Sequence, residues 1–317
     1  YIQILYLIYK NKYEIIHFEW LVFIQKSSLE LFFLRLMSKR SKIILTVHNI
    51  YPHSIDVSRN SNKAIAYKKR FQRIDKVVSH YIVHTEASVL ELSKEFGIPL
   101  DKISVCVHGL FLPEIQEAKT KKDNRNELYN VLMFGVQSPY KGTDIFIDAI
   151  SLLPNDMRRK LSVTIAGIST DYRNSSWPNK ALGLGINWID KLLEESELNE
   201  LLEISNLIVF PYRIISQSGA LLLALSYGKP IVVSDLPSFK ETLSGFPDSI
   251  FFKNGDAQEL SQKIVDFVNG TVETVSILKR IDDVQKRLSW EVAAKQTIRT
   301  YKKLLILSHN IFYNEKY

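Results

Sequence analysis

The feature that most constrains the fold is a repeated alternation of short apolar runs with longer amphipathic segments. The apolar runs lie at residues 15–18, 43–47, 81–83 and 104–107, and again at 131–134, 162–166, 186–189, 207–210, 231–233 and 250–252. Strands that are apolar along their whole length are typical of parallel sheets with helices on both faces. The pattern therefore predicts an α/β fold with two Rossmann-like doubly wound domains, which bind ligands at the carboxyl ends of their strands.

A polar, highly charged stretch at residues 114–127 separates the two blocks and predicts a connection between domains. We expect an N-terminal domain over residues 1–115, a second domain over residues 126–288, and a C-terminal helix over residues 289–317. The first block holds fewer strands than a complete domain of this kind usually has. We therefore expect the N-terminal domain to be incomplete, with its first strand and loop absent.

Composition and charge narrow the classes of function. Of the 317 residues, 46% are hydrophobic and 24% are charged, which is typical of a globular protein. The single cysteine, Cys106, rules out an internal disulfide framework, and we expect no metal site and a cytoplasmic location. The net charge of +7 suits a phosphorylated ligand or anionic lipid, although solvated surface lysines explain it equally well. We expect no nucleic-acid partner, because the basic residues are dispersed.

One candidate ligand-binding loop, residues 134–144, follows an apolar run and opens a helix. Gly135 lets the backbone approach a ligand closely, and Gly142 relaxes the turn into the helix. Lys141 stands at the helix N-terminus, where backbone N–H groups and the helix dipole favour an anion such as a diphosphate. The alternative is a solvated lysine beside an ordinary turn.

A second candidate loop, residues 210–220, also follows an apolar run and precedes a helix. It offers hydroxyl, amide and backbone donors that can bind phosphate oxygens and sugar hydroxyls without a metal. These donors belong to Ser216, Gln217, Ser218 and Gly219. The alternative is a serine that caps the helix and has a polar loop around it.

The two loops carry motifs that resemble glycosyltransferase family 4, the group 1 glycosyltransferases. The motifs are YKGTD at residues 140–144 and FPY followed by SQSGALLLALSYGKPIVVSD at residues 210–235. The segments FGIPLDKISVCVHG (96–109) and SWEVAAKQTIRTYKKLL (289–305) resemble the end of that family's first domain and its C-terminal helix, which crosses back to the first domain. The resemblance covers about residues 15–305. It implies the GT-B fold and a reaction that retains the anomeric configuration of the transferred sugar.

The resemblance also implies an activity. A hexose would pass from a nucleotide sugar to a glycan or lipid-linked acceptor with retention, in polysaccharide biosynthesis, with neither metal nor cofactor. Donor-binding residues would be Gly135, Ser138, Lys141, Gly142 and the second loop. His48 matches a histidine that the family places near the reacting sugar, and it joins Lys141 as a catalytic candidate. Further acceptor-side candidates are His17, Asn49, His53 and His108.

The chain departs from the family pattern at two places. Most members have an arginine in the first loop, which by spacing would fall at Val136 or Ser138. Most also have two glutamates in the second loop region, where this chain has Ile215 and Leu223. These departures leave open an inactive GT-B-like binding or partner subunit, and a nucleotide-sugar epimerase is a further alternative.

A membrane surface is the remaining predicted partner. Residues 27–42 and 67–76 mix apolar with basic side chains, a pattern that suits peripheral contact with the anionic inner face of a membrane. Ordinary core helices explain the same pattern more simply. No apolar stretch approaches about 18 residues, so no spanning helix is expected.

Overall fold

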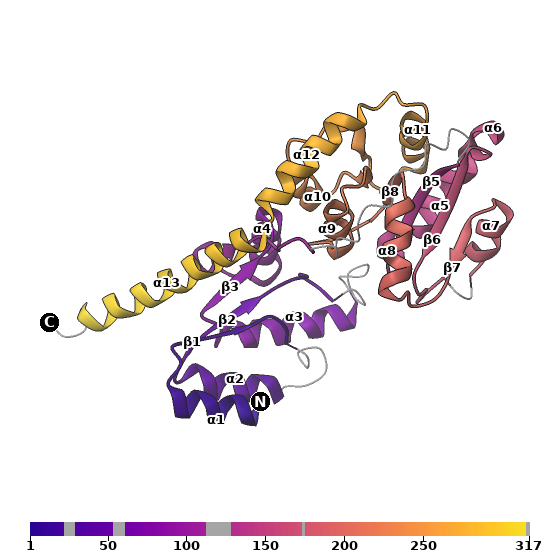
Figure 1. The fold of residues 1–317 in the computed structure, drawn as a ribbon. Helices are drawn as coiled ribbons and strands as arrows, with labels where there is room; N and C mark the ends of the chain where they lie inside the picture. The colour runs from indigo at the N-terminus through magenta and orange to yellow at the C-terminus, as the bar shows by residue number, and fades with distance from the viewer. Residues whose placement is uncertain (22–28, 53–60, 112–127, 173–174, 315–317) are drawn as a thin grey trace. The chain divides into compact units, whose positions relative to one another are not determined.

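The computed structural model describes residues 1–21, 29–52, 61–111, 128–172 and 175–314, with side chains up to residue 306 (Figure 1). The predicted connection at residues 114–127 lies outside the described residues. Contacts divide the chain into two compact units, one of Tyr1–Gly109 with Leu288–Tyr317 and one of Leu110–Arg287. In the described ranges, no helix combines the length and the apolar character needed to cross a membrane.

The first unit contains a four-stranded parallel sheet in the order β1-β2-β3-β4. Its strands are β1 (Ile15–Phe18), β2 (Lys42–Thr46), β3 (His80–Val83) and β4 (Ile103–Val105). Its helices are α1 (Ile2–Asn11), α2 (Leu29–Ser38), α3 (Asn62–Asp75), α4 (Glu86–Phe96) and α13 (Trp290–Asn314), with a short 3-10 helix at Leu100–Lys102.

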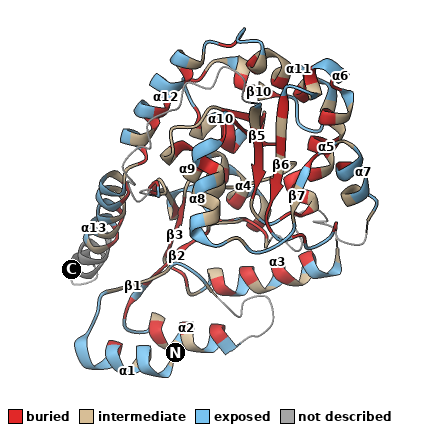
Figure 2. Cartoon of the chain, turned by 45° about the vertical axis from the view of Figure 1, so that its right-hand side comes forward, coloured by how far each residue is buried: buried red, intermediate tan, exposed pale blue. Residues whose placement is uncertain are grey.

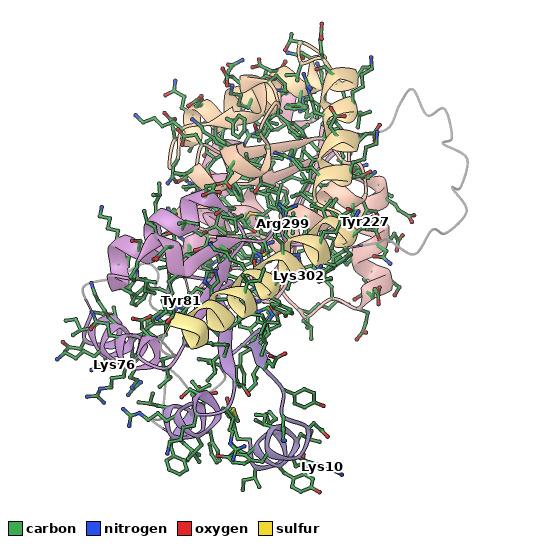
Figure 3. All side chains as sticks on the ribbon, turned by 90° about the vertical axis from the view of Figure 1, so that its left-hand side faces the viewer. Lys10, Lys76, Tyr81, Tyr227, Arg299 and Lys302 are labelled. Atoms are coloured by element: carbon green, nitrogen blue, oxygen red, sulfur yellow. The ribbon has the colours of Figure 1, made fainter. Side chains whose placement is uncertain are left out.

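Alternate residues of each strand in this sheet face opposite sides. Ile43 and Leu45 join the core beneath α2, α3 and α4, whereas Ile44 packs in a second cluster with Leu304 of α13. Helix α13 is amphipathic, and its outward face carries exposed Arg299 and Lys302 (Figure 3). Both faces of the sheet are therefore covered, which explains the continuous apolar character of its strands.

The second unit contains a six-stranded parallel sheet in the order β10-β9-β8-β5-β6-β7. Its strands are β5 (Tyr129–Phe134), β6 (Leu161–Ala166), β7 (Asn187–Ile189), β8 (Leu207–Phe210), β9 (Ile231–Ser234) and β10 (Phe251–Phe252). The α-helices are α5 (Thr143–Leu152), α6 (Asn155–Arg158), α7 (Trp177–Gly183), α8 (Glu195–Ile204), α9 (Gly219–Ser226), α10 (Pro237–Thr242), α11 (Ala257–Val268) and α12 (Thr274–Arg287). Short 3-10 helices lie at Pro139–Lys141 and Asp248–Ile250.

The direction of chain progression in this sheet reverses between β5 and β8. From β5 the chain moves outward through β6 and β7, and then returns to pair β8 with the other side of β5. The central strands are buried, as the red segments of Figure 2 show. A crevice at the carboxyl ends of strands beside such a reversal is the usual ligand site of doubly wound sheets.

All ten strands predicted from the apolar runs are confirmed, with boundaries that differ by at most two residues. Helix α5 buries Phe146, Ala149 and Ile150, and its C-cap residue Leu153 is buried as well. The expected parallel sheets are also confirmed. The apolar runs were sufficient here because the central strands of both sheets are buried on both faces.

Candidate functional site

The loops that follow β5 and β8 lie against each other in the second unit. A Cβ atom on Gly142 would stand 1.9 Å from the carbonyl oxygen of Pro211, and the φ of +69° also favours glycine. The backbone N–H of Arg213 donates to the carbonyl of Tyr140 at 2.7 Å. The two loops thus form one continuous surface at the point where the strand order reverses.

An ion pair braces this loop contact from one side. The Arg213 guanidinium donates to both carboxylate oxygens of Asp144 at 2.8 and 2.6 Å and to the carbonyl of Pro139 at 2.8 Å. Tyr172 also donates to Asp144 at 3.0 Å. Although burial opposes it, the bonds from Arg213 hold the pKa of Asp144 below its usual value. Arg213 therefore holds the two loops together. Its planar guanidinium can donate two parallel hydrogen bonds to one carboxylate, and it does so to Asp144.

Lys141 is buried within this surface and is not a solvated lysine. Its exposed fraction is 7%, and its Nζ lies 5.2 Å from the centroid of the Tyr212 ring. A Cβ atom on Gly135, whose φ is +102°, would stand 2.5 Å from the same Nζ. Burial lowers the pKa of Lys141, and no carboxylate within the described residues pairs with it. A buried cation without a counter-ion is a place where an anion binds favourably.

Two buried hydroxyls of these loops, Ser138 Oγ and Tyr212 Oη, have no partner at full hydrogen-bond geometry among the described residues, although Ser218 lies near enough to Tyr212 to act on its pKa. Burial raises the pKa of Tyr212, so its hydroxyl remains a neutral donor. Buried polar groups in native proteins nearly always have partners, and exceptions call for a ligand, a water or an ion. Together with the Lys141 ammonium, these hydroxyls can hold an anion with several oxygens.

The rest of the second loop leads into helix α9. Ser218 Oγ accepts the N–H of Leu221 at 3.1 Å, so this serine caps the helix, as the alternative interpretation of the loop has it. Ser216 and Gln217 are half-buried and Gly219 is exposed at the helix N-terminus. The positions at which the family resemblance leads one to expect charged groups differ in environment: Val136 is 43% exposed, whereas Leu223 is half-buried.

In the first unit, four histidines lie where successive strands of the sheet end. His17 belongs to β1, His48 follows β2, His84 follows β3 and His108 follows β4. Because the carboxyl ends of parallel strands meet at one edge of a sheet, the last three rings gather there, with centroids 4.8 to 6.2 Å apart. His53 lies outside the described residues.

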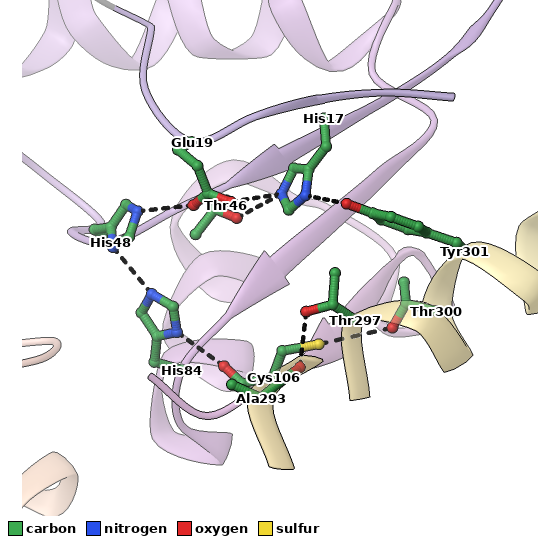
Figure 4. A network of polar contacts seen from close by, with 10 residues as sticks. All are labelled: His17, Glu19, Thr46, His48, His84, Cys106, Ala293, Thr297, Thr300 and Tyr301. Carbon is green, nitrogen blue, oxygen red and sulfur yellow. Dashed lines mark hydrogen bonds and ion pairs between the residues drawn. The ribbon is translucent and has the colours of Figure 1, made fainter. Parts of the chain in front are cut away.

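His48 is at the centre of a hydrogen-bonded network (Figure 4). Its Nε2 lies 3.2 Å from Glu19 Oε2, and its Nδ1 lies 3.0 Å from His84 Nε2. The ring stacks on Trp20 with a centroid distance of 4.3 Å and an interplanar angle of 10°. Trp20 is 62% exposed, so it is not a core side chain.

The other two histidine candidates, His17 and His108, contact helix α13 and the ends of neighbouring strands. His17 lies 2.7 Å from the Tyr301 hydroxyl of α13 and 2.7 Å from the Thr46 hydroxyl, so both ring nitrogens are engaged. His108 Nδ1 bonds to the carbonyl of Gly109 at 2.7 Å, and its ring lies 5.3 Å from that of Trp290. These contacts give His17 and His108 a part in seating α13 on the sheet.

A small pocket opens beside His48, with a volume of about 100 Å³. Its lining includes Glu19, Trp20, Thr46, His48 and Asn49. The hydrogen bond from His48 lowers the pKa of Glu19 to about 2, so this residue is a carboxylate. Within the described ranges, no group of three or more His, Cys, Asp or Glu residues is arranged to hold a metal ion.

Several residues of these sites had no role assigned from the sequence. Tyr212, Arg213 and Asp144 complete the donor-side loops, and Tyr301 bonds to a histidine 284 positions away. Tyr212 belongs to the FPY motif and Asp144 to the YKGTD motif, whereas for Arg213 the only available signal was its position shortly after a strand. For Tyr301 the sequence holds no signal, because only the packing of α13 brings it to β1.

Comparison with known proteins finds glycosyltransferases. Residues 129–269 match the family model described as "Glycosyl transferases group 1". The chain is 21% identical over 289 residues to an uncharacterized glycosyltransferase of Methanocaldococcus jannaschii, a match that covers 89% of this chain and 72% of the relative.

Among solved structures, HepE of Anabaena in complex with UDP superposes with a TM-score of 0.72 at 15% identity. That match covers 95% of this chain and 81% of HepE. Sucrose-phosphate synthase of Thermosynechococcus elongatus also gives a TM-score of 0.72, at 17% identity, over 95% of this chain and 76% of the synthase.

Proposed function

The chain carries a group 1 glycosyltransferase domain and is a glycosyltransferase of GT-B fold, and from this premise we propose that its donor is a nucleotide sugar held by the loops after β5 and β8. The transferred group is a hexose, and the acceptor is a glycan or a lipid-linked sugar of polysaccharide biosynthesis. The anomeric configuration is retained, and neither a metal ion nor a cofactor takes part. We place the reaction in the cytoplasm, at the inner face of the membrane.

The observation that carries the proposal is the buried ammonium of Lys141, which no carboxylate among the described residues pairs, over the Tyr212 ring and in the same loop as Ser138, whose hydroxyl has no partner there. A diphosphate supplies the negative charge and the acceptor oxygens that these three groups lack. The N-terminus of α9 adds backbone donors at Gly219 and the residues that follow. HepE of Anabaena, which shares the fold, binds UDP.

The same groups support transfer without a metal. As the bond between the sugar and the diphosphate breaks, negative charge grows on the leaving phosphate, where Lys141 and the helix N-terminus stabilise it. The acceptor hydroxyl attacks from the face that the nucleotide leaves, and an oxygen of the departing diphosphate takes the hydroxyl proton. This course retains configuration and needs no pair of carboxylates at glycosidase spacing.

On the acceptor side, we propose that His48 and Asn49 line the acceptor pocket, with His17 and His108 supporting it from behind. Of these four, only His48 and Asn49 line the pocket beside Trp20. His53 stays a candidate from the sequence.

An inactive, donor-binding subunit is a second candidate, favoured by Val136 and Leu223, which carry no charge where related enzymes have charged groups. Donor binding with no turnover would support it. Transfer or hydrolysis of the donor that is lost in Lys141→Ala would exclude it.

The test combines binding with turnover. Thermal unfolding is followed with UDP-, GDP-, dTDP- and ADP-linked sugars, because a ligand that binds the folded state raises the melting temperature. The donor that binds is then assayed for transfer with and without EDTA, and NMR gives the anomeric configuration of the product. Lys180→Ala is the matched control, since Lys180 is an exposed lysine paired with Asp148. Loss of activity with EDTA, or an inverted product, would contradict the proposal.

We further propose peripheral contact with an anionic membrane through α2 and α3. Leu29 and Phe32 on α2 are each 56% exposed and lie on the same helix as exposed Arg35. Helix α3 combines Ile65, 47% exposed, with several basic side chains. Co-sedimentation with vesicles containing phosphatidylglycerol should fall in Phe32→Ser, and equal binding of variant and wild type would exclude this surface.

A further inference from the structure

The network around His48 fixes where its protons lie. Cys106 offers a backbone carbonyl to His84 Nδ1 at 2.8 Å, and a carbonyl oxygen only accepts. His84 Nδ1 therefore carries a proton. The other nitrogen of His84 faces His48 Nδ1 at 3.0 Å, and His48 Nε2 faces the Glu19 carboxylate at 3.2 Å.

Both ends of this chain are acceptors, so the two rings between them must supply three N–H donors. Two neutral imidazoles carry only two N–H groups in total. The His84–His48 pair therefore holds one extra proton whenever all three hydrogen bonds are formed. One of the two rings is an imidazolium.

The network on the other side of Glu19 requires no further proton. Tyr301 donates its hydroxyl to His17 Nδ1, His17 Nε2–H donates to Thr46, and the Thr46 hydroxyl donates to Glu19. This direction leaves His17 neutral, and burial lowers the pKa of His17 in agreement. The Glu19 carboxylate thus accepts from both sides.

The extra proton belongs on the ring beside the carboxylate. His48 contacts Glu19 directly, whereas His84 is separated from Glu19 by the His48 ring, and opposite charges in contact attract most strongly. Burial lowers the pKa of His84 to about 4, so His84 is neutral near pH 7.

The remaining titratable groups around His48 do not change this assignment. Burial lowers the pKa of His108, which bonds to the Gly109 carbonyl, and raises the pKa of the Cys106 thiol. Burial also raises the pKa of Tyr301. Among the residues that the structure describes, Glu19 is therefore the one anion in contact with the His48 ring.

We infer that Glu19 is a positioning residue that holds His48 as an imidazolium, with both ring protons bound to Glu19 and His84. For the proposed transferase, on which this consequence rests, His48 has no free lone pair with which to take a proton from the acceptor. It presents a fixed positive charge at the pocket, stacked on Trp20, and the hydroxyl proton passes to another base.

The test is NMR of the full chain with ¹⁵N-labelled histidine, which distinguishes a doubly from a singly protonated ring. The signal is assigned by its loss in His48→Gln. Glu19→Gln is the key variant, because its amide oxygen still accepts from Thr46 while its NH₂ donates to a neutral His48 Nε2. In Glu19→Gln, the hydrogen bonds of the network are therefore kept, while the carboxylate charge and the imidazolium charge are both lost.

At about pH 7, where a free histidine is mostly neutral, we expect a doubly protonated His48 in the wild type. The Glu19→Gln variant should show a ring protonated at Nδ1 alone. Glu14→Gln, an exposed glutamate just before β1, is the matched control and should leave the wild-type signal unchanged. A singly protonated His48 in the wild type, or a doubly protonated one in Glu19→Gln, would overturn the inference.

A kinetic measurement tests the consequence for catalysis. Glu19→Gln should lower kcat by about tenfold or more, as the loss of one fixed charge does, and it should add little to the defect of His48→Gln. Equal kcat in Glu19→Gln and wild type would remove the catalytic consequence. The NMR readout needs no donor, so a wild type without transferase activity would refute the proposed function and leave the assigned protonation state standing.

Discussion

Replacing Lys141 with methionine should have opposite effects on the free protein and on its complex with a nucleotide. Methionine keeps the length and apolar stem of lysine but removes the ammonium. In the free protein that ammonium is buried, with 7% of the residue exposed, and it lacks a carboxylate partner within the described residues. Burying an unpaired ion costs several kcal/mol even after relaxation.

The Tyr212 ring offsets part of that cost. A desolvated ammonium over an aromatic ring, here 5.2 Å from the centroid, is stabilised by about 2 kcal/mol. The remaining difference predicts that the methionine variant is more stable than the wild type by about 1–2 kcal/mol. For a protein of 317 residues, with an unfolding entropy of about 2.1 cal/mol/K per residue, that raises the melting temperature by about 1.5–3 °C.

Nucleotide binding should weaken at the same time. Removing one partner of a buried, hydrogen-bonded charge pair costs about 2–5 kcal/mol, which is about 30-fold to a few thousandfold in Kd. A nucleoside diphosphate at 100 times the wild-type Kd stabilises the wild type by about 2.7 kcal/mol. At the same concentration, a 30-fold weaker variant gains only about 0.9 kcal/mol.

The assay is thermal unfolding of both proteins, alone and with UDP, GDP, dTDP or ADP. Lys180→Met is the control, because exposed ion pairs contribute about 0–1 kcal/mol and Lys180 pairs with Asp148 at the surface. Its response to nucleotide should equal that of the wild type. The reasoning fails if Lys141→Met melts lower than the wild type without nucleotide, or if nucleotide stabilises it to the same extent.

Three further predictions concern the loops and the histidines. Gly142→Ala should lose several kcal/mol of stability and nucleotide binding together, because its Cβ would stand 1.9 Å from the Pro211 backbone; a melting temperature equal to that of the wild type would contradict this. Asp144→Asn should cost about 1–2 kcal/mol, because Arg213 loses its charged partner but is 37% exposed and keeps its bond to Pro139. Urea unfolding measures the loss, and no change in stability would show that this ion pair does not hold the loops. Burial lowers the pKa of His84 from 6.5 to about 4, so the unfolded chain binds more protons between these values; the stability of the first unit should fall as pH drops from about 6.5 to about 4, and less so in His84→Gln.

The strand content of this protein was evident from the sequence because its sheets are parallel and buried. Runs such as 131–134 and 207–210 are apolar at every position, and the structure places strands there. After the first of these runs, glycines marked the loop correctly, since Gly135 and Gly142 both have positive φ. Local composition determines these features, so no tertiary information was needed.

Strand order, in contrast, is not written in local composition. The pairing of β5 with β8 brings two loops about 75 residues apart into contact, and it turns Lys141 into a buried cation beside Tyr212. The sequence around a lysine next to a turn does not show whether its side chain is exposed to solvent or buried.

The histidine network shows the same division. The sequence placed His48 directly after a strand, but a single strand end does not specify its partners. The order β1-β2-β3-β4 decides that Glu19 and His84 flank His48, and the packing of α13 decides that Tyr301 reaches His17. The sequence by itself determined which segments are strands and which residues follow them, because burial acts on each residue locally. Only the tertiary structure decided which strand ends are neighbours, since hydrogen bonds and charges depend on distances between segments far apart in the chain.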